Sequence, residues 1–100
     1  MTEQETYSWI FLATALASQS GPTNLQGISS VADGINHAVP THKEMNSSLN
    51  WLREKKLIEK DGKKYQLSQQ GNIMIDKLSG KDDSIMIIWN RIEKEIKNYA

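Results

Sequence analysis

The fold is decided by residues 49–71, whose sequence is LNWLREKKLIEKDGKKYQLSQQG. The pair Asp61-Gly62 is a strong signal for a two-residue hairpin turn, because glycine adopts a positive φ without steric cost. Counting outward from this pair places Ile58 opposite Tyr65, which gives the hairpin one apolar face. The stretch therefore predicts two short antiparallel strands within residues 58–67.

The residues before the hairpin predict a helix over 41–55. Thr41 is followed three residues later by Glu44, which is the spacing of a capping box at a helix N-terminus. The apolar residues of this helix recur at i, i+4 and i+7, so they lie on one face and predict its buried side. They are Met45, Leu49 and Leu52.

The remainder of the chain predicts four further helices. Their ranges are 5–18, 26–35, 69–78 and 82–99. The first of them is apolar over most of its circumference, which is typical of a helix buried between two layers. A chain of 100 residues forms one core, and the absence of cysteine excludes disulfides and thiolate metal sites. We expect a single domain over residues 1–100, mainly α with a small antiparallel β-hairpin.

Charge is unevenly distributed, although the chain is neutral overall. Residues 1–40 carry three acidic and no basic side chains, and residues 41–64 carry seven basic against four acidic ones, a net charge of +3. Residues 65–100 have five of each sign. The basic excess therefore coincides with the predicted helix 41–55 and the hairpin, which matters more for a polyanionic partner than the net charge does.

The order of the helices and the hairpin, together with residues 49–71, resembles bacterial transcription regulators of the winged helix-turn-helix superfamily. The nearest types are the multiple-antibiotic-resistance and phenolic-acid-decarboxylase regulators, and the similarity covers residues 23–71. The resemblance implies a helix-turn-helix plus wing over 23–67 and an additional C-terminal helix over 82–99. Residues 33–41 (DGINHAVPT) are also similar to a set of small bacterial winged-helix proteins, which implies the fold but no function.

Two features depart from the pattern of these regulators. Lys56 stands where they usually have glycine, and a left-handed conformation at this lysine would cost on the order of 1 kcal/mol. The connection over residues 36–40 is longer than the tight turn of a helix-turn-helix. A longer connection allows the third helix to dock at an altered angle.

The resemblance implies that the helix 41–55 lies in the major groove of DNA and that the wing contacts the phosphate backbone. The candidate contact residues are Lys43, Asn46, Ser47, Asn50, Arg53, Lys60, Lys63 and Lys64. Lysine can contact guanine and asparagine can bridge adenine, so these side chains suit base readout. The alternative is a solvated helix face beside lysines that protect a strand edge. Glu54, on the same face, would repel phosphate.

The C-terminal helix carries an apolar stripe that is wider than one small core needs. The residues predicted to form a dimer interface on this helix are Ile85, Ile88, Trp89, Ile92 and Ile96. In the regulators that this chain resembles, terminal helices commonly pair two protomers, so a homodimer is expected. The alternative is that this helix covers the first helix and completes the core of one chain.

Asp33, Asn36 and His37 fall on one face near the end of the second helix. One interpretation makes them a small polar site with His37 as a pH sensor. In the other, which we favour, Asn36 and His37 cap the carbonyl groups of the helix and Asp33 orients the imidazole.

No spacing in the sequence is typical of a nucleophile elbow, a phosphate-binding glycine loop, a pair of catalytic carboxylates or a metal site, so we expect neither an enzyme nor a cofactor. No apolar run reaches the roughly 20 residues that cross a bilayer, and no secretion signal is evident, so we expect a cytoplasmic chain without a membrane partner. The predicted function is DNA-binding transcription regulation, with double-stranded DNA as the partner. The alternative is a winged-helix module that binds a partner protein through Trp51 and the C-terminal stripe.

Overall fold

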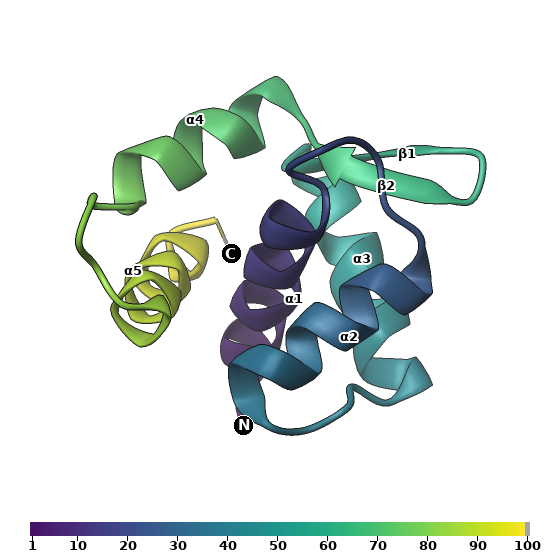
Figure 1. Ribbon diagram of the computed structural model, residues 1–100, viewed down its shortest axis with the longest axis horizontal. Coiled ribbons are helices and arrows are strands. Elements are labelled where there is room, and N and C mark those ends of the chain that lie inside the picture. Colours follow the sequence, from purple (N-terminus) through teal and green to yellow (C-terminus); the bar gives the residue numbers. More distant parts are fainter. Residues whose placement is uncertain (100) are drawn as a thin grey trace.

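The computed structural model describes residues 1–99, which form five helices and one two-stranded sheet (Figure 1). The elements are α1 (Glu3–Ala17), α2 (Leu25–Asn36), α3 (His42–Glu54), β1 (Ile58–Asp61), β2 (Lys64–Leu67), α4 (Gln69–Leu78) and α5 (Ile85–Lys97). The fold is mainly α with a small antiparallel hairpin after α3, a winged-helix topology extended by a C-terminal helix, so the predicted fold class is confirmed. Within residues 1–99, the helices are too short or too polar to pass through a membrane.

Helix α1 occupies the centre of the molecule. Its residues from Trp9 to Ala13 are at most 1% exposed, because α2 and α3 pack on one side of it and α5 on the other (Figure 1). The indole Nε1 of Trp9 donates a hydrogen bond to the carbonyl of Ala32 in α2 at 2.9 Å. This bond satisfies the one polar group of a buried ring and joins the first two helices.

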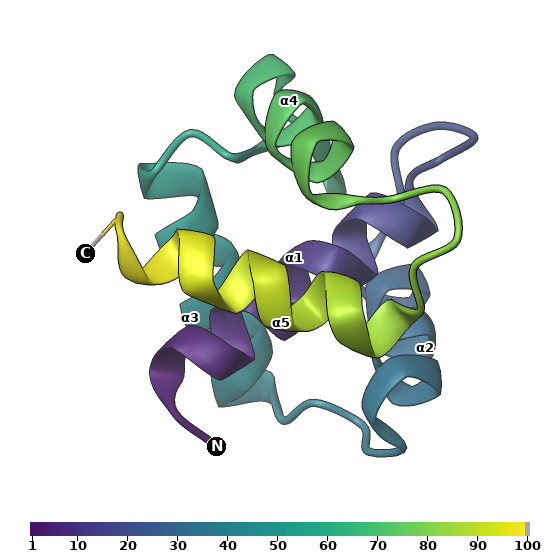
Figure 2. The same cartoon turned by 90° about the vertical axis from the view of Figure 1, so that its left-hand side faces the viewer.

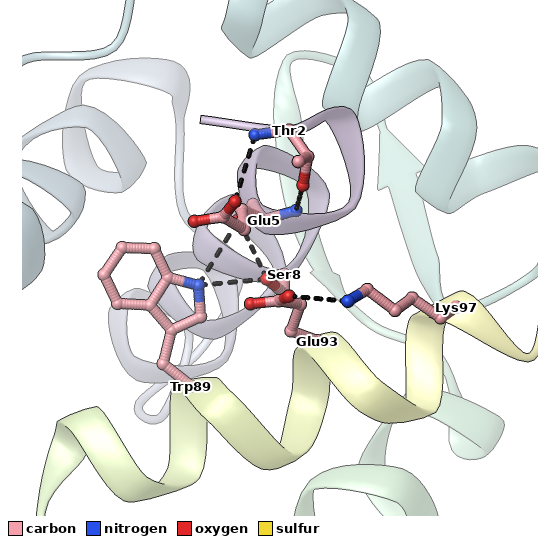
Figure 3. A network of polar contacts seen from close by, with 6 residues as sticks. All are labelled: Thr2, Glu5, Ser8, Trp89, Glu93 and Lys97. Carbon is pink, nitrogen blue, oxygen red and sulfur yellow. Dashed lines mark hydrogen bonds and ion pairs between the residues drawn. The ribbon is translucent and has the colours of Figure 1, made fainter.

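Helix α1 begins before the predicted start because a second capping box precedes it. The backbone N–H of Thr2 donates to Oε1 of Glu5, and the N–H of Glu5 donates to Oγ1 of Thr2, both at 3.1 Å (Figure 3). The hydrogen bond from the Thr2 backbone holds the pKa of Glu5 below its ordinary value, since it favours the charged carboxylate. One of the two hydrogen bonds of the cap is therefore favoured by an ionised Glu5.

Polar contacts join α5 to α1 (Figure 3). The indole Nε1 of Trp89 donates to Oγ of Ser8 at 2.9 Å and lies 3.3 Å from the carbonyl oxygen of Glu5. The Ser8 hydroxyl donates in turn to the same carbonyl at 2.8 Å. Beside this network Ile92 and Ile96 are fully buried. Helix α5 is consequently part of the core of the single chain.

The predicted hairpin is confirmed, but its predicted register is wrong: each residue of β1 pairs two residues further along β2 than predicted, and the turn lies one residue later. Ile58 pairs with Leu67, and the two turn residues are Gly62 and Lys63 instead of Asp61 and Gly62. Of these two turn residues only Gly62 has a positive φ, 63°, as in a type II′ turn. The observed register thus needs no left-handed aspartate, and it sets two buried side chains, those of Ile58 and Leu67, directly opposite each other.

Four residues form what we call the wing root, where α3, the hairpin and α4 meet. They are Lys56, Leu57, Ser68 and Gly71. Lys56 has a φ of 62°, so this lysine does occupy the left-handed conformation of the usual glycine position. The Ser68 hydroxyl donates to the Lys56 carbonyl at 2.6 Å, and the Ser68 N–H donates to the Leu57 carbonyl at 3.1 Å. The root therefore holds both ends of the hairpin together.

Candidate nucleic-acid interface

Helix α3 is held in place by its N-terminal cap and its apolar face. The N–H of Thr41 donates to Oε1 of Glu44 at 2.9 Å, and the N–H of Glu44 donates to Oγ1 of Thr41 at 3.0 Å, so the predicted capping box is confirmed. Met45, Leu49 and Leu52 are at most 6% exposed, and α3 packs against α1. The opposite face of α3 is consequently open.

All eight residues predicted to contact DNA are exposed, and we call them the α3–wing surface. They are Lys43, Asn46, Ser47, Asn50, Arg53, Lys60, Lys63 and Lys64. The first five belong to α3 and the other three to the hairpin, which projects from the body of the molecule (Figure 1). Helix α5 lies on the opposite side of α1 and does not cover this surface.

The five cations of the α3–wing surface have no ion-pair partner within residues 1–99. The ion pairs found there are Lys77–Glu95, Arg91–Asp83 and Lys97–Glu93, all in α4, in α5 or in the turn between them. The basic groups of α3 and the hairpin are therefore available to an anionic partner.

The three lysines of the hairpin differ in their surroundings. Lys60 pairs with Tyr65 across the strands, and its Nζ lies 5.7 Å from the centroid of the tyrosine ring. This cation–π contact holds Lys60 over the strand pair. Lys63 lies in the turn at the tip and Lys64 follows it. These two lysines are the better placed to reach a phosphate backbone.

Trp51, a predicted contact for a partner protein, is half-buried against α1. Its ring stacks on that of Tyr7 with centroids 4.7 Å apart and planes inclined by 12°. Burial raises the pKa of the Tyr7 hydroxyl, and the nearby Glu3 carboxylate, which accepts its hydrogen bond at 3.4 Å, raises it further. The aromatic pair therefore joins α1 to α3 and leaves Trp51 only partly accessible.

Two carboxylates interrupt the basic character of the α3–wing surface. Glu54 and Glu59 line a hollow of about 610 Å³ between the end of α3 and β1, together with Arg53 and Lys60. A basic band from Lys43 across Arg53 to Lys60 is consequently not continuous. Phosphate groups approaching this point would meet repulsion as well as attraction.

Four of the five residues predicted as a dimer interface belong to the core of the chain. Ile88 and Trp89 are 9% and 7% exposed, and Ile92 and Ile96 are fully buried, because α5 lies along α1 (Figure 2). Within the single chain these four side chains hold α5 on α1, and a dimer interface at this helix stays a prediction. Only Ile85 is exposed, beside Met86 and Ile87 in the first turn of α5.

His37 ends α2 through its backbone. It has a φ of 55°, and its N–H donates to the carbonyl of Asp33 at 2.7 Å, as in a helix cap. The favoured interpretation is therefore confirmed for the His37 backbone. His37 is exposed, and among the described residues no hydrogen bond joins the Asp33 carboxylate to the imidazole, so the predicted orientation of the ring by Asp33 is not observed.

Comparisons with protein-family models, with curated proteins and with solved structures each find nothing similar. The described residues also hold no group of three or more His, Asp or Glu side chains placed to bind a metal ion. A function has to be inferred from the chemistry of the α3–wing surface.

Proposed function

We propose that this chain is a winged-helix transcription regulator that binds double-stranded DNA, with α3 in the major groove and the hairpin as a wing on the phosphate backbone. The observation that carries the proposal is the exposure of all eight residues of the α3–wing surface. The cations among them have no ion-pair partner in the described residues, so binding to phosphate would break no existing pair. The proposal places the chain in the cytoplasm.

Base readout would fall to the N-terminal half of α3. A recognition helix presents its first turns to the base edges, and these turns carry Lys43, Asn46 and Ser47, with Asn50 in the next turn of α3. Lysine pairs with the acceptors of guanine, and asparagine with the adjacent acceptor and donor of adenine. Glu54 is the last residue of α3 and is remote from Lys43, although it lines the same hollow as Asn50.

Phosphate contacts would come mainly from the wing and from the end of α3. About four phosphate contacts would come from Arg53, Lys60, Lys63 and Lys64. Four such contacts give a slope of log affinity against log salt concentration of about −3.6. One site of this size binds weakly, so we expect two chains to bind together. The exposed first turn of α5, Ile85 to Ile87, is the remaining candidate for pairing two chains.

The experiment that tests this function measures binding of the whole chain to a library of genomic duplexes by fluorescence anisotropy at two salt concentrations. Lys63→Ala combined with Lys64→Ala should weaken binding to every duplex and reduce the magnitude of the salt slope by about 1.8. The matched control is Lys81→Ala combined with Lys94→Ala, which removes the same charge from exposed positions beyond α4. Equal losses in both double variants, or no duplex bound at low salt, would contradict the proposal.

The second candidate function is a module that binds a partner protein. The observations that favour it are the carboxylates of Glu54 and Glu59 within the basic surface and the exposed apolar side chains of Met86 and Ile87, which are 59% and 45% accessible. A folded chain that binds no duplex at low salt would support this candidate, because any basic DNA-binding surface retains non-specific affinity under those conditions.

A further inference from the structure

A cleft of about 560 Å³ lies between the C-terminal half of α1, strand β2, helix α4 and the first turns of α5. Figure 2 shows α4 and the first turns of α5 beside this end of α1. The volume is within the range of sites that hold small molecules, roughly 300–1,000 Å³. None of the eight residues of the α3–wing surface lines the cleft, so it is separate from the candidate DNA interface.

The more deeply buried residues that line the cleft are apolar, and most of the exposed ones are polar. Helix α1 contributes Leu12 and Leu16, β2 contributes Leu67, and Ile75 and Ile88 come from α4 and α5. Helix α1 and the three consecutive elements β2, α4 and α5 therefore converge on one space, although α1 is far from the other three in the sequence. An apolar wall of this kind binds a ligand by removing its hydrocarbon surface from water, which favours a molecule with a hydrophobic body.

Most of the exposed residues that line the cleft are polar, and several come from α4 and the residue after it. Asn72 and Asp76 stand at i and i+4 on one face of α4, and Ser79, which follows the helix, also lines the cleft. Across from them lie the neutral amides of Gln19 and Gln66. Asp76 is the only charged residue that lines the cleft within residues 1–99, and no ion pair in that range involves it.

We propose that this cleft binds a small hydrophobic monocation, of the arylalkylammonium class. The hydrocarbon body would contact Leu16, Ile75 and Ile88, and the ammonium group would lie beside the Asp76 carboxylate with the neighbouring amide oxygens as further acceptors. A lone carboxylate on an otherwise neutral rim selects a cation over an anion by charge alone. Asp76 is exposed, so this selection amounts to a factor of a few in affinity and the apolar contacts supply most of the binding.

The test uses the whole chain with methyl-labelled leucine and isoleucine, titrated with 2-phenylethylammonium and followed by NMR. The neutral 2-phenylethanol and the anion 3-phenylpropionate are titrated in parallel. We expect saturable shifts of the Leu16, Ile75 and Ile88 methyl groups, with the ammonium compound binding a few-fold more tightly than the alcohol and the anion binding most weakly. The exposed Ile73, which does not line the cleft, should not shift.

The variant Asp76→Asn should abolish the preference for the ammonium compound over the alcohol while binding of the alcohol persists. The matched control Asp82→Asn removes an exposed carboxylate that does not line the cleft and should keep the preference. The proposal is overturned by shifts that do not saturate or that centre outside the cleft, by tighter binding of the anion, or by a preference that survives in Asp76→Asn. None of these outcomes depends on whether the chain binds DNA.

Discussion

At the scale of the single residue, Gly71 determines how closely α4 approaches the wing root. A Cβ added at Gly71 would lie 2.0 Å from the carbonyl oxygen of Leu57. The position of a Cβ is fixed by its own backbone, and the Leu57 oxygen is a backbone atom, so neither atom can rotate away from the other. Leu57 also accepts the N–H of Ser68, the residue that caps α4. Any larger residue at position 71 therefore separates α4 from the end of α3.

The substitution Gly71→Ala is expected to destabilise the fold by about 1–3 kcal/mol, the usual range for overpacking a close contact. The matched control is Gly34→Ala in α2, where an added Cβ meets nothing within 4 Å. That change should stabilise the chain by about 0.5–1 kcal/mol, because alanine loses less conformational freedom in a helix. Urea denaturation of both variants measures the difference, and a Gly71→Ala protein as stable as Gly34→Ala would contradict the close approach.

Single residues were predictable from the sequence only where a local rule applied. The resemblance to regulators with a glycine at position 56 raised a left-handed conformation there as a condition, and Lys56 has it. The turn was placed one residue too early, because Asp61-Gly62 is itself a good turn pair and the register is decided by what the strands bury. The contact of Gly71 with Leu57 depends on two segments meeting in space, and no spacing in the sequence signals it.

At the scale of the element, caps and apolar periodicity define the helices. Thr2 and Glu5 begin α1, and Thr41 and Glu44 begin α3, each with a complete capping box. Such signals are local, which is why the order of elements could be predicted from the sequence. The packing of α5 on α1 could not be predicted from the sequence, because the apolar stripe of α5 has the same pattern whether a second chain or α1 covers it.

The capping box of α1 predicts a pH dependence of stability. The Thr2 backbone N–H lowers the pKa of Glu5 in the folded chain. Ionised Glu5 therefore stabilises the fold at pH values above the ordinary glutamate pKa. This stabilisation is lost as the pH falls through the lowered pKa of the folded chain. Glu5→Gln should therefore narrow the difference between urea midpoints at pH 7 and at about pH 3. Glu59→Gln, outside any cap, serves as the control. An unchanged difference in Glu5→Gln would refute the linkage.

At the scale of the whole molecule, α1 separates two faces of different composition. The α3–wing surface lies on one side of it, and α5 lies on the other (Figure 1). The exposure of the α3–wing residues could be predicted from the amphipathic pattern of α3, because the buried side of a helix fixes the open side. The cleft at the end of α1 could not be predicted, since it exists only where four separate elements meet.

Trp89→Ala tests whether α5 is part of the core of one chain. The change removes a side chain that is 7% exposed and hydrogen-bonded to Ser8, so it should reduce the free energy of unfolding by about 3–5 kcal/mol. Trp89→Phe, which keeps most of the buried area, should lose less. Thermal unfolding measures both, and sedimentation of the parent and the variants reports their mass. A Trp89→Ala chain that stays as stable as the parent but halves in mass would instead assign Trp89 to a dimer interface.

The wing root gives the hairpin a mechanical character. Its first strand begins directly after Leu57, and its second strand is followed by Ser68, which is hydrogen-bonded back to Lys56 and Leu57. A hairpin whose two ends are hydrogen-bonded to each other cannot rotate independently of α3 and α4. A force applied at its tip is shared between α3 and α4, and the compliant point of the ribbon is the turn at Gly62 and Lys63.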